Sequence, residues 1–321
     1  MPDSAELIQA FDARARRRDF FKTVIGTAVI GASGFAFSNA ASAQAVTDAD
    51  ILNFALNLEY LEAQFYSFAA FGTGLANADL GGTGAQGQVV GGRQVTFTDP
   101  VVRQYAREIA IDEIAHVKFL RTALGAAAVA QPAINISGDA NGAFTAAARA
   151  SGVVGPTGTF DPYADDNSFL LGAYIFEDVG VTAYKGASPL ITNNTFLDAA
   201  AGILAVEAFH AGIIRGSLYA KGVATPALRT AADQISNARD SLDGTTDLDQ
   251  GISPVATPLT TAAGTTTALA SNFVPTDANG VAFSRTTGQV LNIVYLTRAA
   301  ATAGGFFPAG VNGTIRTSAA N

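Results

Sequence analysis

The chain has 321 residues, a formal net charge of −8 and no cysteine. Without thiols it can form no disulfide framework and offers no sulfur ligand to a metal ion. From residue 46 onward it also lacks a basic cluster suited to a phosphate backbone, so we expect no nucleic-acid partner. The length allows one large domain, or one domain with an elaborate extension.

The first 45 residues have the pattern of an export signal. The pair Arg17 and Arg18 precedes an apolar run over residues 23–37, and small residues offer cleavage sites after Ala43 or Ala45. The paired arginines resemble a twin-arginine signal. The apolar run is shorter than the roughly 17 to 25 residues needed to span a bilayer, and no later stretch qualifies as a spanning helix. We therefore expect an extracytoplasmic protein, periplasmic or secreted, without stable membrane insertion after cleavage.

Two helices are predicted at the start of the mature chain. Thr47 and Asp50 have the spacing of a capping box, with Asp in place of the usual Glu. Asp99 followed by Pro100 predicts the start of a second helix, and Gly125 predicts its end. We expect the two helices to pack as a pair.

The segments that follow each of these helices are rich in glycine or alanine. After the first helix, residues 89–95 predict a small hairpin that turns at Gly91 and Gly92. After the second helix, residues 126–165 have room for one short helix at about 144–149. A connection of this length can cross from one end of a helical bundle to the other.

The second half of the chain predicts two long helices and an extension. The long helices are expected at about residues 168–186 and 195–222, each with an apolar stripe at helical spacing. A fifth helix is expected over 226–242, and residues 251–267, rich in Thr, Ala and Pro, are expected to be irregular. A last amphipathic stretch, 287–301, is expected to cover apolar surface of the bundle or of a neighbouring subunit.

Both histidines of the chain stand in a Glu-x-x-His step. The first step is Glu113 to His116, and the second is Glu207 to His210. Positions i and i+3 share one face of a helix, so each step directs one carboxylate and one imidazole to the same place. One such step is usually a solvated helical pair. Two steps that use every histidine of the chain favour a metal site instead.

The first helix carries glutamates in the stripe that should be buried. Glu59 and Glu62 alternate there with apolar residues, although residues 46–92 contain no Lys or Arg that could pair with them. Buried carboxylates need a partner. A bound cation would supply one.

Tyrosines reveal an internal repeat. Tyr66 follows Glu59 by seven residues, Tyr184 follows Glu177 by seven, and each pair precedes one Glu-x-x-His step. Two helix hairpins would then supply the same side chains twice. One Glu from each of two helices and Glu-x-x-His from the other two is the arrangement of ferritin-like di-iron and di-manganese bundles.

Three stretches carry a resemblance to a known family. They are Asn-Phe-Ala-Leu-Asn-Leu-Glu-Tyr-Leu-Glu at 53–62, Asp-Glu-Ile-Ala-His-Val at 112–117, and Gly-Gly-Phe-Phe-Pro-Ala-Gly at 304–310. Their wording is similar to the exported, desiccation-related branch of the ferritin-like superfamily, and the resemblance covers most of residues 47–310. The glycine-rich insertion and the C-terminal extension differ from cage-forming ferritins, which argues against iron storage in a shell.

The resemblance and the repeat lead to one fold. We expect an all-α protein in which residues 46–223 form a four-helix bundle, with antiparallel hairpins joined by a long crossover. Residues 224–321 are expected to form a helical and irregular extension packed on that bundle.

The resemblance also implies the site. It places the metal ligands at Glu59, Glu113, His116, Glu177, Glu207 and His210, and it makes Tyr66 and Tyr184 partners of ligating carboxylates. Asp112 precedes the first Glu-x-x-His step whereas Val206 precedes the second, so the support of the two histidines is expected to be unequal. Because the repeat pairs Glu59 with Tyr66, we expect Glu62 to be a neighbour of the site one turn away.

The charge of the site and the type of its donor atoms limit which metal ions it can bind. Four carboxylates gathered in a bundle core would repel one another or stay protonated, and two divalent cations would neutralise them. A mixed oxygen and nitrogen set suits iron or manganese. We therefore expect two iron or manganese ions, and the choice between the two metals stays open.

Three functions fit this site. The first is redox handling of dioxygen, peroxide or Fe(II) in stress protection, by a ferroxidase-like or manganese-catalase-like reaction on a small-molecule oxidant. The second is sequestration of metal without turnover. The third is a non-catalytic structural or desiccation-protective bundle, with or without metal. Association into a homo-oligomer is left open.

Overall fold

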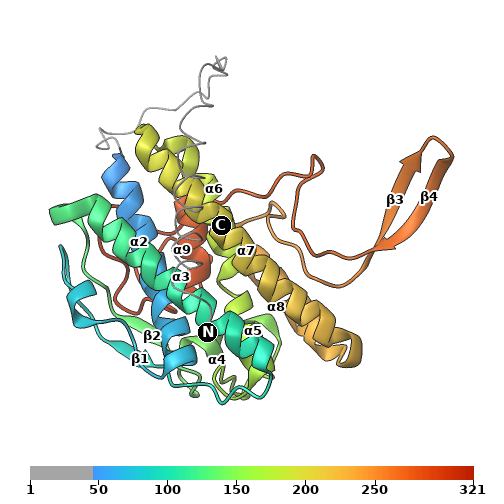
Figure 1. Cartoon of the computed structure of the whole chain (residues 1–321), viewed down its shortest axis with the longest axis horizontal. Coiled ribbons are helices and arrows are strands. Elements are labelled where there is room, and N and C mark those ends of the chain that lie inside the picture. Colours follow the sequence, from blue (N-terminus) through green and yellow to red (C-terminus); the bar gives the residue numbers. More distant parts are fainter. Residues whose placement is uncertain (1–45) are drawn as a thin grey trace, which may run out of the picture. The chain divides into compact units, whose positions relative to one another are not determined.

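A computed structural model describes residues 46–321, which form one compact unit (Figure 1). The export pattern of residues 1–45 lies outside the described residues. The described part is mostly helical, so the expected all-α bundle is confirmed.

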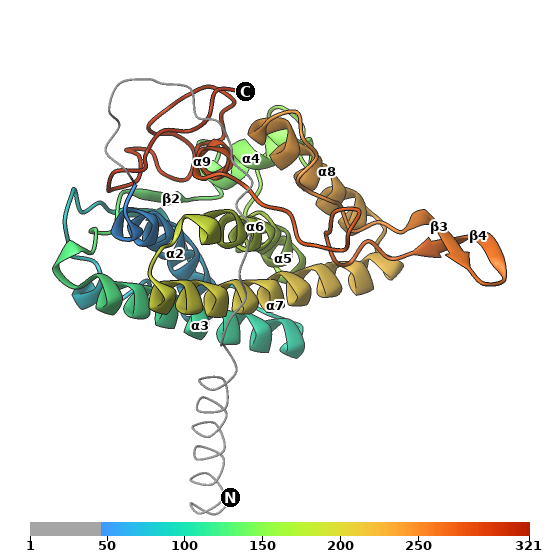
Figure 2. The ribbon, with the colours of Figure 1, turned by 90° about the horizontal axis from the view of Figure 1, so that it is seen from above.

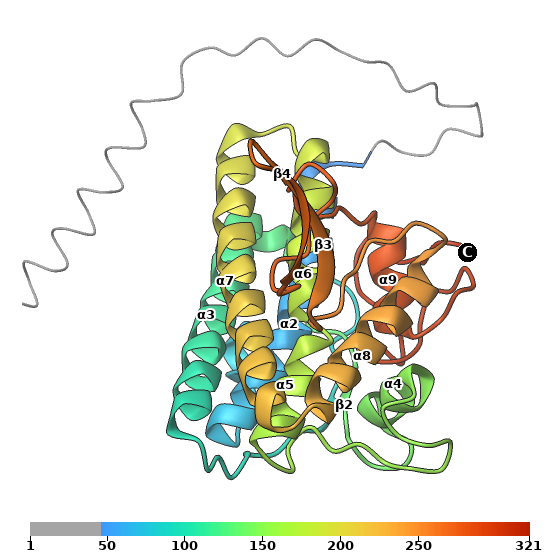
Figure 3. The ribbon, with the colours of Figure 1, turned by 90° about the vertical axis from the view of Figure 1, so that its right-hand side faces the viewer.

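Long helices in two hairpin-like pairs build the bundle. Helix α2 (Asp48–Phe71) packs along α3 (Pro100–Leu124), and α6 (Glu177–Ala187) packs along α7 (Asn194–Ala224). Figures 2 and 3 show these four helices side by side. Helix α5 (Asp166–Tyr174) precedes α6 and also packs on α7.

Local capping signals determine where the first two helices begin. The Thr47 side chain accepts a hydrogen bond from the Asp50 amide while the Asp50 carboxylate accepts one from the Thr47 amide, which is the predicted capping box. The Asp99 carboxylate accepts from the amides of Val101 and Val102. Both predicted helix starts are confirmed.

Helix α2 lies at the centre of the molecule and is buried on nearly all sides. Its partner α3 covers one side, and the C-terminal segment covers another through paired hydrogen bonds between the Asn57 side chain and the Asn312 backbone, both 2.9 Å long. Phe306, fully buried, packs against Phe176 and Phe144. A helix that is apolar all round needs such cover.

The helix expected over 168–186 is broken in two, so that prediction is wrong at its middle. Helix α5 ends at Tyr174 and α6 begins at Glu177. The carbonyls of Tyr174 and Ile175 at the break accept hydrogen bonds from the buried Arg239 guanidinium on α8 (Ala227–Asp243). The Arg239 side chain thus hydrogen-bonds carbonyls that would accept from backbone amides if the helix were continuous.

The hairpin predicted at 89–95 is also wrong. Strand β1 (Val89–Gly91) pairs in parallel with β2 (Ile134–Ile136) in the crossover segment. At Gly91, with φ of 83°, a side chain would collide with the backbone of Ser137. The glycine therefore permits the close approach of two segments and does not make a hairpin turn.

The remaining elements belong to the crossover and the extension. The short helix expected in the crossover is confirmed as α4 (Ala143–Ser151). Helix α9 (Thr287–Tyr295) is the expected amphipathic helix, although it ends at Tyr295 and not near residue 301. Single 3₁₀ turns among the described residues lie at Asn77–Asp79, Gly125–Ala127 and Ser188–Leu190.

The segment 251–267 is not irregular as expected. It contains β3 (Val255–Thr261), which pairs antiparallel with β4 (Gly264–Ala270). Threonine is β-branched and favours strands, and this preference outweighs the Ala and Pro content on which the prediction relied.

One helix of the described chain, α7, is long and apolar enough to cross a membrane by length and composition. The expectation that no stretch after the leader qualifies is therefore wrong on that criterion. Only 33 % of the most apolar window of α7 is buried inside the protein, so much of its apolar surface is left on the outside.

Candidate metal centre

The side chains of the two Glu-x-x-His steps meet those of two further glutamates in the middle of the bundle. Helix α3 contributes one step and α7 the other, while α2 and α6 each contribute one glutamate. The structure buries all six predicted ligands, each at most 8 % exposed: Glu59, Glu113, His116, Glu177, Glu207 and His210.

Three of these side chains surround His116. Its Nδ1 lies 3.1 Å from Glu59 Oε2, 3.5 Å from Glu113 Oε2 and 3.8 Å from Glu207 Oε1. One donor atom from each of the four residues lies within 4.8 Å of all the others. This spacing can place three carboxylates and one imidazole around a single cation.

A second group surrounds His210. Its Nδ1 lies 3.0 Å from Glu113 Oε1 and 3.6 Å from Glu177 Oε2. Glu113 therefore presents one oxygen to each imidazole. A carboxylate in that position can bridge two cations held side by side.

Unpartnered polar atoms concentrate at this place. Among residues 46–321, ten buried side-chain nitrogen or oxygen atoms have no hydrogen-bond partner, and six of them belong to Glu113, Glu177, Glu207 and His210. Buried polar groups in native proteins nearly always have partners. Two hard cations would take up the free lone pairs of these oxygens and of the imidazole, so the donor set fits the predicted pair of ions.

Burial and charge perturb every titratable group here. Burial raises the pKa of Glu59 to about 7 and that of Glu177 to about 8. Burial opposes ionisation of Glu113 too, but the two histidines beside it hold its pKa below the usual range. Burial would lower the pKa of the histidines, yet neighbouring carboxylates raise it to about 11 for His116 and about 10 for His210. When no metal is bound, protons on the carboxylates and imidazoles offset the repulsion between the negative charges of the site.

The two predicted tyrosines pair with carboxylates of the opposite hairpin. Tyr66 donates a hydrogen bond to Glu177 Oε1, and Tyr184 donates one to Glu59 Oε1. Burial raises the pKa of both phenols well above 10, so they remain donors. Each tyrosine orients the glutamate of the other helix pair and leaves its second oxygen facing the centre.

The support of the two imidazoles is unequal, as expected, but it crosses between hairpins. Asp112 Oδ2 lies 3.3 Å from His210 Nε2, so the aspartate beside the first Glu-x-x-His step supports the histidine of the second. Val206 occupies the equivalent place on α7, and within residues 46–321 no carboxylate contacts Nε2 of His116. The two ends of the site are therefore chemically different.

Glu62 is buried beside the centre, 6 % exposed. After burial, its charge is the largest contribution that raises the pKa of Glu207. It is also the only charged residue that lines a small apolar cavity between α2, α6 and α9, where its neighbours include Gly180 and Phe306. The structure thus brings Glu59 to His116 and places Glu62 one turn away at the cavity wall.

Sequence reasoning missed two features. A side chain at Gly180 would collide with Glu207 Oε2, so this glycine makes room for the carboxylate; a glycine inside a helix midway between Glu177 and Tyr184 was the available signal. Behind Glu177 lies a buried network of ion pairs. The signal for it in the sequence was Arg215, a single arginine within the apolar sequence of α7. The members of the network are Asp178, Arg215, Arg239, Asp243, Asp249 and Arg285.

Comparisons with known proteins agree with this geometry. A family model described as a ferritin-like domain matches residues 47–220. The chain is 30 % identical over 277 residues to the ferritin-like catalase Nec2 of Nesocodon mauritianus, a match that covers 84 % of each chain. It is 29 % identical over 250 residues to the desiccation-related protein PCC13-62 of Craterostigma plantagineum, with 76 % of each chain covered.

Proposed function

Because this chain belongs to the ferritin-like family, we propose that it binds two iron or manganese ions and uses them to disproportionate hydrogen peroxide. The observation that carries the proposal is the set of six unpartnered donor atoms on four buried residues. The name of one relative, a ferritin-like catalase, supports the choice of reaction.

The metal ions and the protein side chains have separate roles in this reaction. A bound metal pair would store two electrons between two half-reactions. One peroxide gains two electrons and two protons and becomes two waters; a second loses two electrons and two protons and becomes dioxygen. Glu62, whose pKa burial raises well above its usual value, can hold a proton on its carboxyl group beside the site. Tyr66 and Tyr184 keep Glu177 and Glu59 oriented throughout.

The decisive measurement is elemental analysis together with oxygen evolution. We expect about two iron or manganese ions per chain and one dioxygen for every two peroxides consumed. Glu113→Gln, which alters the bridging carboxylate, should reduce bound metal and oxygen release together. Glu108→Gln, an exposed glutamate on the same helix, is the matched control and should change neither.

A second function, a metal-bound desiccation-protective or sequestering bundle, is favoured by the other relative. Bound metal without oxygen release would support it and contradict peroxide disproportionation. Turnover of Fe(II) without turnover of peroxide would point to a ferroxidase. Where no turnover occurs, a fall in melting temperature on chelation would separate a structural metal from a sequestered one.

We also propose that the protein acts outside the cytoplasm, because residues 1–45 have the pattern of a twin-arginine signal. Detection of the mature chain in the periplasmic or secreted fraction would support this location. A chain that stays in the cytoplasm would contradict it.

A further inference from the structure

The outer face of α7 is neutral, and the rest of the described chain, residues 46–321, leaves it uncovered. Its exposed residues between Asp198 and Lys221 carry no charge, and Phe209 is 73 % exposed. The charged side chains and the histidine of this stretch, Glu207, Arg215 and His210, are all buried. Small residues dominate the remaining exposed positions, which are Ala201, Gly202, Ala205, Ala208 and Ala220.

A second neutral surface projects from the extension. We call residues 255–270, strands β3 and β4 with their turn, the arm. Its strand residues are exposed apart from the half-buried Ala270, and the strands pack on each other with no extensive contact to another described element. Figures 1 and 2 show the arm standing away from the helices. An isolated two-stranded hairpin is marginally stable at best, so the arm needs a surface to pack on.

The root of the arm is fastened to α7. Arg215 donates to the carbonyls of Gln250 (3.0 Å) and Gly251 (2.7 Å) before the arm. It also donates to those of Asn272 and Phe273 after the arm, each at 2.7 Å. One buried guanidinium thus holds both ends of the segment. The arm is presented from a fixed base, which lowers the entropy lost when it binds.

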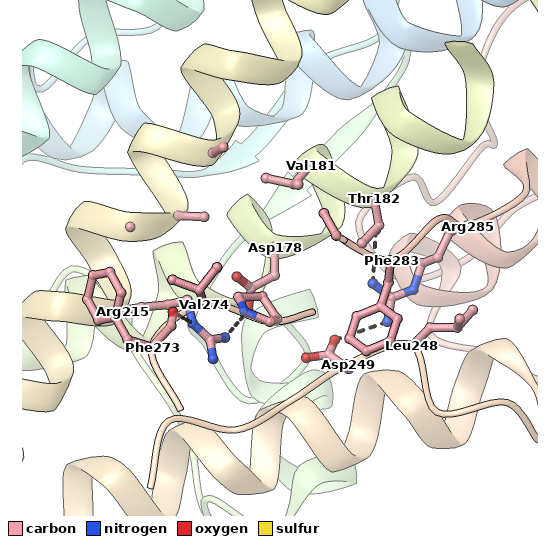
Figure 4. A pocket seen from close by; sticks show the side chains of 15 residues that line it. Asp178, Val181, Thr182, Arg215, Leu248, Asp249, Phe273, Val274, Phe283 and Arg285 are labelled. Carbon is pink, nitrogen blue, oxygen red and sulfur yellow. Dashed lines mark hydrogen bonds and ion pairs between the residues drawn. The ribbon is translucent and has the colours of Figure 1, made fainter. Parts of the chain in front are cut away.

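An apolar groove of about 140 Å³ opens beside this root (Figure 4). The α7 side chains Ala208 and Ala211 form one wall, and Phe273, Val274 and Phe283 of the extension form the other. Its charged lining residues are engaged in ion pairs or hydrogen bonds with one another. The groove continues the outer face of α7 and adds depth to it.

We propose that the outer face of α7, with its groove, receives the arm of a second copy of this chain, and that two copies exchange arms about a two-fold axis. The chain is acidic, with a net charge of −8, so two copies repel each other unless neutral surfaces meet. Both surfaces are neutral: residues 250–276 contain no charged side chain. The small residues of α7 let a flat ribbon lie close to the helix.

The area available favours mutual exchange over a one-sided contact. A ribbon of two seven-residue strands is about 23 Å long and about 10 Å wide. One arm alone covers less than the about 800 Å² per partner of a stable interface. In a two-fold exchange each copy buries its own arm and its own α7 face, which doubles the footprint to about 460 Å² per copy. Mutual exchange thus comes closer to the area of a stable interface than a one-sided contact does.

The composition of the arm favours contact through its face. Val255 and Leu259 lie on one face with Ala268 and Ala270 of the opposite strand, as the pairing register requires. Pro258 removes one backbone donor from β3, which disfavours addition of another strand at that edge.

Sedimentation velocity of the purified protein at micromolar concentration tests the exchange. We expect a dimer. Val255→Lys with Leu259→Lys on that face of the arm, and Ala205→Glu with Phe209→Glu on α7, should each give monomers. An equimolar mixture of these two variants should restore a dimer, because one arm then meets an α7 face of opposite charge while the other contact stays unaltered. Val90→Lys, an equally exposed valine on β1, is the control and should remain dimeric.

Cysteine cross-linking gives a second readout on a background without thiols. Mixing Leu259→Cys protein with Ala205→Cys protein and oxidising should link two chains. A chain with both substitutions that closes an internal disulfide in place of a dimer would show that the arm folds onto its own α7, which overturns the proposal. So would a monomeric wild type, arm variants that stay dimeric, or flotation of the wild type with neutral lipid vesicles through the α7 face. Metal content measured on every variant separates these results from failure of the metal site.

Discussion

At the scale of the residue, Gly180 leaves space for a carboxylate on another helix. A glycine inside a helix usually costs about 0.5 to 1 kcal/mol relative to alanine, yet here a β-carbon would strike Glu207 Oε2. We expect Gly180→Ala to weaken metal binding at least tenfold in a chelator competition. Gly202→Ala in α7, where a β-carbon meets nothing within 4 Å, should leave metal affinity unchanged. Equal affinities in both variants would show that Glu207 does not need its observed position.

Asp112 makes the two ends of the site unequal. Groups that orient a ligating histidine typically contribute 10- to 100-fold to metal affinity. Since Asp112 supports only His210, Asp112→Ala should lower the affinity for one of the two ions by about tenfold. The two steps of a metal titration should then separate. Val206→Asp should raise the affinity for the other ion. A uniform loss of both ions in Asp112→Ala would contradict the assignment.

The protons of the metal-free site predict a pH dependence. The folded pKa values of Glu59 (about 7) and Glu177 (about 8) are raised above the ordinary value of 4.5. Their protonated forms thus favour folding below about pH 4.5, and this stability is lost as the pH rises through 7 to 8. Cations replace the protons, so the difference in melting temperature between loaded and chelated protein should be larger at pH 8 than at pH 6. A difference independent of pH would refute this account.

At the scale of the element, the break between α5 and α6 depends on α8. Arg239 binds the carbonyls exposed at the break and pairs with the buried carboxylates of Asp178 and Asp249. Loss of one partner from a buried ion network costs about 3 to 5 kcal/mol. We expect Arg239→Leu to lower the free energy of unfolding by that amount in urea denaturation. Arg107→Leu, exposed on α3, should change it by less than about 0.5 kcal/mol.

Helix α8, through Arg239, also affects the metal site indirectly. Because α6 begins at Glu177, this proposed ligand lies in the first turn of its helix, beside Asp178 of the ion network. Bound metal should therefore be partly lost in Arg239→Leu even where the protein remains folded. Full metal content in folded Arg239→Leu would show that the break and the site are independent.

At the scale of the whole molecule, the centre is enclosed on every side by helices and by the extension. Because the carboxylates and imidazoles of the centre are buried, an ion must enter before the bundle closes or through a transient opening. A twin-arginine route carries proteins already folded, so we predict loading before export. Arg17→Lys with Arg18→Lys should leave a folded, metal-loaded precursor inside the cell, as measured by fractionation and metal analysis. A retained precursor without metal, beside a loaded exported wild type, would place loading after export.

The sequence by itself determined the features that depend on local spacing. Capping residues at Thr47 and Asp99 set helix starts, and the i, i+3 geometry put Glu113 with His116 on one face, because both effects act within one or two helical turns. The repeat of Glu59 and Tyr66 likewise selected Glu59 over Glu62. Tertiary structure alone decided which partners meet across helices: Tyr66 with Glu177, Asp112 with His210, and Arg239 with the break before α6. It also joined β1 to β2 and set the arm apart from the bundle, because contacts between distant segments depend on packing that no local pattern records.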